Sequence, residues 1–342
     1  MLKQFFAIIT IVGMVVGSGV VSGKEIVVFF SRFGYFSFFT IIISFFMFYF
    51  LFKFILVKCE YIKNKIKNSK FALLANFIFC TIFSASMFAG INNLLNSDEN
   101  LINILIFLLI FLFCVVIFKK GIKSLNKLNL ILVPVMLFVF AVLLISKITS
   151  VEKGGFNFGG VSIFYAILYV LLNVSSGCVL IADLGRELTK KQKTRVAFFS
   201  ALVLSLILLI TNMVLLAYPN FLSNPMPLLD ILGGNSVVIE VLIFIGSATT
   251  LFSIVYSISI ILRSVCKNEI INFFVCIGVP LFLSLWGFGP IIAYLYPLAS
   301  VMGGMFLFWV LFIPSFNRNN QKIHSGSQNT KDKNACHNNI EF

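Results

Sequence analysis

Apolar stretches long enough to cross a lipid bilayer recur along the whole chain and leave little sequence for any other kind of fold. A membrane-spanning helix needs about 20 predominantly apolar residues. The chain is 60% hydrophobic and 11% charged, whereas soluble domains carry roughly 25% charged residues. We therefore expect an all-α polytopic membrane protein with ten transmembrane helices. The apolar stretches cover residues 5–31, 35–57, 71–94, 101–118, 129–148, 161–184, 196–218, 236–262, 270–287 and 290–313.

Basic residues gather in alternate loops between these stretches. Lys and Arg are retained in short cytoplasmic loops, which accounts for the net charge of +14 without any nucleic-acid partner. We expect a multi-pass protein of the plasma membrane with both termini in the cytoplasm. Its transmembrane domain covers 1–316, and a polar tail over 317–342 has the composition of a disordered segment. The basic loops lie at 58–70, 119–127, 186–195 and 263–267.

Two of the stretches carry clusters of poor helix formers near their middle. The first reads Val16-Gly-Ser-Gly-Val-Val-Ser-Gly23, and the second reads Asn173-Val-Ser-Ser-Gly177. A glycine costs roughly 1 kcal/mol relative to alanine inside a helix. We expect helix 1 to break into halves at 5–16 and 20–31, and helix 6 to break as well. The alternative interpretation is that these small residues only let two helices pack closely.

The two clusters lie five stretches apart, which predicts an inverted repeat. An odd number of spans in a repeat inserts the second copy upside down, here as repeats over 5–148 and 161–313. Paired interruptions in corresponding helices indicate the binding site of a secondary transporter near the bilayer midplane. An unwound backbone at that depth is tolerated only where protein or a water-filled cavity surrounds it.

The segment over 13–34 resembles the first-span signature of YkvI-type membrane proteins. That signature usually reads Gly-Ala-Gly-Phe-Ala-Ser-Gly-Gln-Glu, where this chain has Gly-Ser-Gly-Val-Val-Ser-Gly-Lys-Glu over 17–25. YkvI-type proteins belong to the amino acid, polyamine and organocation (APC) superfamily. The resemblance implies a LeuT-type fold of five plus five inverted spans with helices 1 and 6 broken. Lys24 departs from the signature, because glutamine is usual there.

The resemblance also implies a sodium site. In sodium-coupled relatives, carbonyls of the first half-helix face a Gly-x-x-[Ser/Thr]-[Ser/Thr] motif in the eighth span, and hard cations favour such oxygen ligands. Serine and threonine in a span more often bond to carbonyls of their own helix, and proton coupling is the alternative. The positions implied for sodium are Gly13, Val16, Gly246, Thr249 and Thr250.

An amino acid would fit between two broken helices. Free amides of the half-helix after Gly19 would receive its carboxylate, and carbonyls near Asn173 to Ser176 would accept hydrogen bonds from its ammonium group. Glu25 lies inside a span and is a candidate proton carrier or gate residue, or alternatively an interfacial charge. Its neighbour Lys24 points about 100° away on a helix. The positions expected to contact the solute are Val15, Gly17, Ser18, Gly19, Asn173, Ser175, Ser176 and Gly177.

The sequence offers little for catalysis. Both histidines, His324 and His337, lie in the tail, and no Gly-x4-Gly-Lys-[Ser/Thr] phosphate-binding loop occurs. We expect no enzyme activity and no cofactor, with Na+ or H+ as coupling ion. The sequence favours a secondary active transporter of an amino acid or similar small solute, working by alternating access. The alternative is a ligand-sensing subunit of the spore germination receptor type, which would bind an amino acid without net transport.

Overall fold

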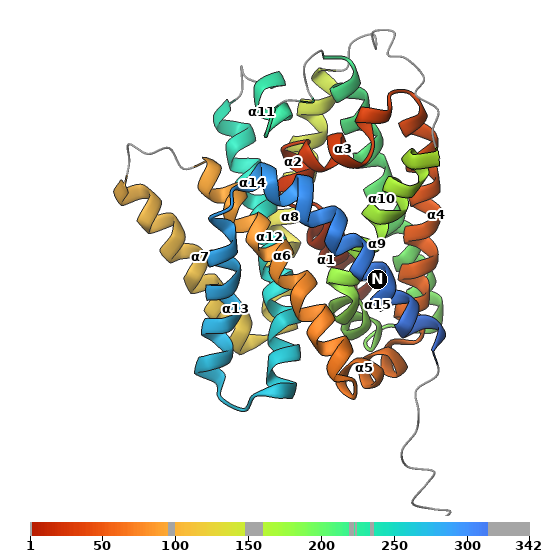
Figure 1. Cartoon of the computed structure of the whole chain (residues 1–342), viewed down its shortest axis with the longest axis vertical. Helices are drawn as coiled ribbons and strands as arrows, with labels where there is room; N and C mark the ends of the chain where they lie inside the picture. Colours follow the sequence, from red (N-terminus) through yellow and green to blue (C-terminus); the bar gives the residue numbers. More distant parts are fainter. Residues whose placement is uncertain are drawn as a thin grey trace, which may run out of the picture. The chain divides into compact units, whose positions relative to one another are not determined.

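Every regular element in the part of the chain that the structure describes is a helix (Figure 1). The computed structural model describes residues 2–94, 100–147, 160–218, 222, 224–232 and 236–313. The chain up to Val310 forms one compact unit. The tail expected to be disordered, 317–342, lies outside the described residues.

Seven of the described helices are long and apolar enough to cross a membrane, so the chain is a multi-pass membrane protein. Two shorter apolar helices, α1 (Leu2–Val15) and α13 (Glu269–Ser284), and α7 (Asn100–Lys120) accompany them. The expected total of ten spans stays a prediction. The seven are α4 (Phe36–Val57), α6 (Lys70–Leu94), α8 (Ile122–Ser146), α9 (Gly160–Gly185), α10 (Lys190–Leu216), α12 (Ser236–Val265) and the stretch Phe288–Phe312, which is made of α14 (Phe288–Pro290), the π-helical turn η3 (Ile291–Leu295) and α15 (Tyr296–Phe312).

The first apolar stretch is divided into short pieces. Helix α1 ends at Val15, α2 covers Ser18–Val21 and α3 covers Lys24–Phe29, followed by the 3-10 turn η1 (Ser31–Phe33). Gly17 has an extended backbone between α1 and α2. Gly23 has a φ of +83° between α2 and α3, a conformation that glycine adopts without steric cost. The expected second half-helix over 20–31 is therefore itself divided.

The expected break in the sixth stretch is wrong, because α9 runs as one helix from Gly160 to Gly185. Its polar side chains bond to carbonyls of their own helix instead of unwinding it. The Ser175 hydroxyl donates to the Leu171 carbonyl at 2.6 Å, and the Ser176 hydroxyl donates to the Asn173 carbonyl at 2.9 Å. Intrahelical bonds of this kind keep small polar residues compatible with a helix, and one glycine in the cluster is too few to break it.

Two short helices occupy connections between the long ones. Helix α5 (Cys59–Lys67) lies in the basic loop after α4 and is amphipathic, with Cys59, Ile62 and Ile66 buried. It packs against α9 and α6. Helix α11 (Pro227–Ile231) lies in the connection between α10 and α12, with proline in its first turn. The sequence pattern predicted both regions as loops.

The divided first stretch lies in the interior of the helical unit. Helix α1 packs against α8, α10 and α12, and α2 packs against α6 and α12. The side chains from Ile11 to Val21 are all at most 1% exposed. The backbone that leaves helical geometry is thus enclosed by protein, as a membrane interior requires.

Basic segments from different parts of the sequence meet at one end of the helices, which we call the basic end. Lys63 of α5 contacts Asp183 at the end of α9. The turn at Gly121, which follows Lys119 and Lys120, lies beside Tyr256 of α12. The Lys65 ammonium group donates to the carbonyls of Trp309 and Val310 at the end of α15. Assignment of the basic end to the cytoplasm stays a prediction.

Candidate functional site

The interruption between α1 and α2 is packed so closely that its glycines leave no room for side chains. A Cβ atom added to Gly17 would lie 2.8 Å from the Met87 sulfur and 3.0 Å from the Thr250 hydroxyl oxygen. The Ser18 hydroxyl contacts the same Met87 sulfur at 3.4 Å. Val15 is likewise buried. Gly17 and Ser18 therefore lie against α6, and Gly17 also against α12, while Val15 and Gly19, the other predicted solute-contact positions of this stretch, are buried beside them.

The interruption frees backbone carbonyls toward α12. The Thr250 hydroxyl donates to the Gly13 carbonyl at 2.9 Å, which has no helical partner after α1 ends. A Cβ atom on Gly246 would lie 3.4 Å from the Val16 carbonyl oxygen, which receives no donor among the described residues. The Thr249 hydroxyl donates to the Gly246 carbonyl at 3.1 Å. The structure thus brings the five positions implied for sodium together.

Glu25 points into the protein and not toward the membrane surface. Its side chain is 0% exposed and folds back over α2, where any Cβ atom on Gly19 would overlap it. Neither carboxylate oxygen makes a hydrogen bond of standard geometry with a described residue, and the neutral Tyr296 hydroxyl is the group that interacts with the carboxyl. The alternative that Glu25 is an interfacial charge reaching for lipid headgroups is therefore wrong.

Two tyrosines that sequence analysis did not single out surround this carboxyl group. Tyr296 of α15 and Tyr169 of α9 both interact electrostatically with Glu25. The Tyr296 hydroxyl also shares a hydrogen bond with the Ser86 hydroxyl of α6. The Tyr169 hydroxyl is buried and has no described partner. A tyrosine inside an apolar span was the available signal, because its hydroxyl needs a polar neighbour when buried.

The remaining predicted solute positions on α9 serve packing. Ser175 lies against Gly303 of α15, and Gly177 lies against the Met14 side chain of α1. The Ser175 carbonyl accepts a hydrogen bond from Asn76 at 3.3 Å, and the Ser176 carbonyl accepts one from Cys80 at 3.4 Å. The expectation that free carbonyls near Asn173 to Ser176 hold an ammonium group is therefore wrong.

Asn173 alone among these α9 positions keeps an unused polar atom. Its amide group donates to the Tyr169 carbonyl one turn earlier at 2.9 Å. Its side-chain oxygen is buried without a described partner. Asn173 and Tyr169 share one face of α9, since residues four apart lie on the same side of a helix.

Residues 224–232, which include α11, lie against the α2–α3 junction, and we call them the lid. The backbone N–H of Leu228 in α11 donates to the Ser22 carbonyl at 3.0 Å. The Lys24 ammonium group donates to the Asn224 carbonyl at 2.8 Å. Lys24 and Glu25 form no ion pair with each other within the described residues, as the helical spacing predicts. Lys24 therefore fastens the lid, and Glu25 faces the interior.

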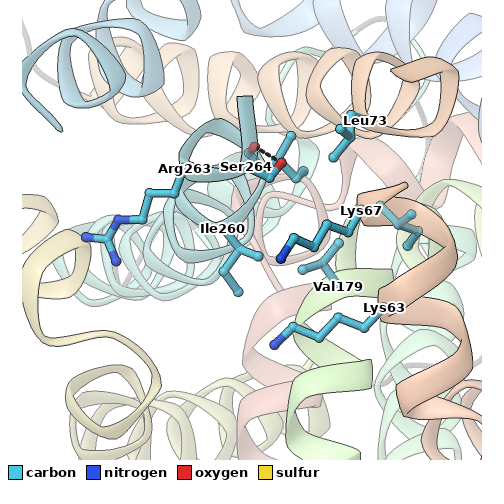
Figure 2. A pocket seen from close by; sticks show the side chains of 9 residues that line it. Lys63, Lys67, Leu73, Val179, Ile260, Arg263 and Ser264 are labelled. Atoms are coloured by element: carbon cyan, nitrogen blue, oxygen red, sulfur yellow. Dashed lines mark hydrogen bonds between the residues drawn. The ribbon is translucent and has the colours of Figure 1, made fainter. Parts of the chain in front are cut away.

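A cavity of about 410 Å³ opens at the basic end between α5, α6, α9 and α12. Figure 2 shows Lys63 and Lys67 extending across Val179, while Arg263 extends away from them. The apolar part of the cavity lining includes Leu73, Val179 and Ile260. The cavity thus combines a basic entrance with an apolar interior.

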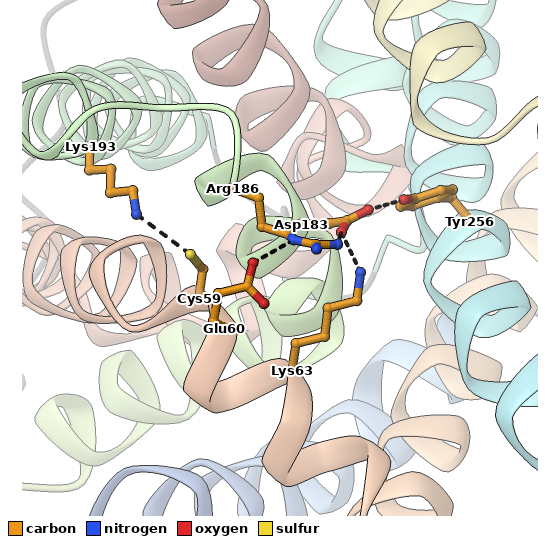
Figure 3. Close-up of polar contacts among 7 residues, drawn as sticks. All are labelled: Cys59, Glu60, Lys63, Asp183, Arg186, Lys193 and Tyr256. Atoms are coloured by element: carbon orange, nitrogen blue, oxygen red, sulfur yellow. Dashed lines mark hydrogen bonds and ion pairs between the residues drawn. The ribbon is translucent and has the colours of Figure 1, made fainter.

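A polar network that includes Lys63 of the cavity lining is centred on Asp183 of α9. Asp183 accepts a hydrogen bond from Lys63 at 2.5 Å and another from the Tyr256 hydroxyl (Figure 3). Arg186 lies 3.7 Å from the same carboxylate and bonds Glu60 at 2.6 Å. The network joins three helices, α5, α9 and α12.

We expect Asp183→Asn to lower the free energy of unfolding by about 1.5–3 kcal/mol, the value of a hydrogen bond to a charged group. Its side chain is only 13% exposed, so solvent screens the pairing little. Glu60→Gln is the matched control, because its pair with Arg186 is about half exposed on both sides and is worth at most about 1 kcal/mol. Thermal unfolding of the purified variants measures both. Equal losses would contradict the assignment of the network to Asp183.

Comparison with known proteins places the chain by its fold. No protein-family model matches it, and no curated protein matches its sequence. Among solved structures it is similar to Mhp1, a nucleobase-cation-symport-1 family transporter in a closed conformation with bromovinylhydantoin bound. The TM-score is 0.56 at 16% identity, over 90% of this chain and 78% of Mhp1.

The chain therefore shares the all-helical fold of Mhp1. The narrower resemblance to YkvI-type proteins stays a prediction. So does the inverted repeat.

Proposed function

We propose that this chain is a secondary active transporter that moves a small organic solute by alternating access around the interruption between α1 and α2. One observation carries the proposal. Within a fold similar to that of Mhp1, the interruption is fully buried and turns the Gly13 and Val16 carbonyls toward α12. Because α9 is unbroken, the argument from paired interruptions no longer contributes, and the proposal rests on one interruption and the fold.

An amino acid is the first solute to test. The backbone at Gly17, Ser18 and Gly19 would supply amides for its carboxylate, as proposed from the sequence. Asn173, with its unused side-chain oxygen, replaces the α9 carbonyls as the acceptor for an amine. Nucleobases and hydantoins form the second solute class, since Mhp1 is a nucleobase-cation-symport-1 family protein with a hydantoin bound.

Uptake into liposomes containing only this chain tests the proposal. Labelled amino acids, nucleobases and hydantoins are offered under an imposed Na+ gradient and, separately, under an imposed pH gradient. Accumulation above the external concentration supports secondary transport. Saturable binding with no accumulation of any solute would contradict it and would favour a sensing subunit.

The family resemblance implies sodium at the five positions of α1 and α12, as the alternative to proton coupling, and Thr250 tests this sodium site. Thr250→Val leaves the buried Gly13 carbonyl without a donor, which we expect to cost about 1–3 kcal/mol of unfolding free energy. Ser247→Ala is the matched control on the same helix, because the Ser247 hydroxyl donates to the Ile243 carbonyl of its own helix and to no other group among the described residues.

Thermal unfolding of both variants in sodium and in choline buffers gives the measurement. A sodium-dependent rise in the wild type that disappears only in Thr250→Val supports the sodium site. A wild type whose unfolding does not respond to sodium contradicts it.

A further inference from the structure

The buried carboxyl group of Glu25 has no cation beside it among the ion pairs of the described residues, and the one hydroxyl that stabilises its charge, that of Tyr296, is neutral. It is 0% exposed, and neither oxygen makes a hydrogen bond of standard geometry with a described residue. No salt bridge described for the chain includes it. An ionised carboxylate in such a place costs several kcal/mol even after the protein relaxes. A proton bound to the carboxyl removes that cost.

The groups that face Glu25 from the elements packed around it are neutral. They are the Tyr169 hydroxyl from α9 and the Tyr296 hydroxyl from α15, whereas α2 contributes only small and apolar side chains. The nearest cations along the chain are engaged elsewhere. Lys24 bonds the Asn224 carbonyl, and Arg32 stacks on the Tyr165 ring at 3.8 Å.

The oxygen cluster at α1 and α12 contrasts with this carboxyl group. There the Thr249 and Thr250 hydroxyls both have carbonyl partners, and the groups of that cluster carry no net charge. Glu25, in contrast, is a buried acid without an ion-pair partner among the described residues. It contacts Gly19 in the interrupted stretch. Any movement of α2 against α3 therefore changes the surroundings of the carboxyl.

We propose that Glu25 carries the coupled proton, which makes this chain a proton–solute symporter. The inference rests on the proposed function and names its coupling ion. Water at one side of the membrane gives a proton to a carboxylate oxygen of Glu25, forming an O–H bond. The neutral acid is then enclosed against Gly19, Tyr169 and Tyr296 while the solute site changes sides. Exposure to water on the other side breaks the O–H bond and returns the proton to solution.

The lid supplies a route for the first step. Ser22, three residues before Glu25, is held by the Leu228 N–H, and Lys24 is held by the Asn224 carbonyl. Release of these two bonds would admit water beside Glu25. Both bonds are present in this structure, and the lid then covers the α2–α3 junction next to the Glu25 carboxyl group.

Proteoliposomes separate the coupling ion from transport itself. The probe is whichever labelled solute the wild type accumulates. It is offered with an inward pH gradient in choline buffer, with the same gradient plus a protonophore, and with a Na+ gradient at equal pH. The wild type is expected to respond to the pH gradient alone and to lose accumulation with the protonophore.

Glu25→Gln keeps the shape of the neutral acid and removes the titrating proton. We expect pH-driven accumulation to fall at least about tenfold, within the range of a typical coupling between two sites, while solute counterflow without a gradient stays within about threefold. Glu187→Gln, an exposed residue in the loop after α9, is expected to match the wild type. Full pH-driven accumulation by Glu25→Gln would overturn the proposal, as would a wild type driven only by sodium.

An infrared spectrum of the purified protein gives a second readout that needs no transport. A protonated carboxyl band is expected in the wild type and in Glu187→Gln, and it should be missing from Glu25→Gln. Glu25→Asp keeps a carboxylic acid and is expected to shift the frequency of the band. This variant replaces Glu25→Gln in the measurement if the glutamine variant does not fold. If the wild type moves no solute, the proposed function fails, and absence of the band would separately overturn the inference. Loss of binding of cationic solutes alone would instead identify Glu25 as a solute ligand and overturn the proton assignment.

Discussion

Replacement of Gly19 by valine is expected to reduce solute uptake by about 10- to 100-fold. Overpacking of a filled interior costs about 1–3 kcal/mol, and each 1.4 kcal/mol is about tenfold in an equilibrium. A side chain at Gly19 would overlap Glu25 along its length, from Cγ to Oε1. The carboxyl would have to leave its position for the variant to close around a solute.

Gly278→Val is the control for this variant. Gly278 also lies inside a helix, α13, but no atom lies within 4 Å of a Cβ atom placed there. Initial uptake rates in proteoliposomes, normalised to the amount of folded protein, compare the two variants. Uptake by Gly19→Val within about twofold of the control would contradict the assignment of α2 to the transport site, since a 1 kcal/mol change is already about fivefold.

Replacement of Gly185 by leucine is expected to cost about 1–3 kcal/mol of unfolding free energy, or to prevent folding. A Cβ atom there would lie 2.8 Å from the Leu56 carbonyl oxygen and 3.2 Å from the Leu56 Cα atom. These are backbone atoms at the end of α4, so no side-chain rotation relieves the clash. The contact between α4 and α9 therefore depends on a residue without a side chain.

Gly160→Leu is the matched control at the other end of the same helix, where a Cβ atom meets nothing within 4 Å. The buried thiols of Cys59, Cys80 and Cys178 provide the measurement, because a thiol-reactive fluorophore reaches them only on unfolding. A lower unfolding temperature is expected for Gly185→Leu alone. Equal unfolding temperatures would show that α4 and α9 separate at no cost.

The boundaries of the long helices were largely predictable from the sequence. Helix α4 covers Phe36–Val57 and α6 covers Lys70–Leu94, against expected spans of 35–57 and 71–94. Apolar length is set by membrane thickness and not by neighbours in the fold, so it can be counted along a single chain. Short helices such as α5 and α11 could not be predicted this way, because their stability depends on what they pack against.

The unbroken α9 shows where composition fails as a guide. The first stretch holds Gly17, Gly19 and Gly23, whereas the second cluster holds Gly177 alone. Serine and asparagine unwind a helix only if their side chains take over backbone partners, and in α9 they bond to carbonyls that the helix already satisfies. Serine and asparagine are therefore weaker helix breakers in this span than glycine, and the cluster over 173–177 does not interrupt α9.

The candidate site was predictable in part. The meeting of Gly13 and Thr250 followed from the family resemblance, and the structure joins them by a hydrogen bond. The inward direction of Glu25 could not be read from the sequence, because it depends on the turn that Gly23 makes at a φ of +83°. Tyr169 and Tyr296 come from distant segments and meet Glu25 only in the folded chain.

The bond between the Leu228 N–H and the Ser22 carbonyl joins two main-chain atoms. Substitution of either side chain leaves both atoms in place. The contact between the lid and the α2–α3 junction therefore survives side-chain changes at the proposed solute site. Under the proposed function, side chains around the solute site can therefore change over evolution while this backbone contact is kept.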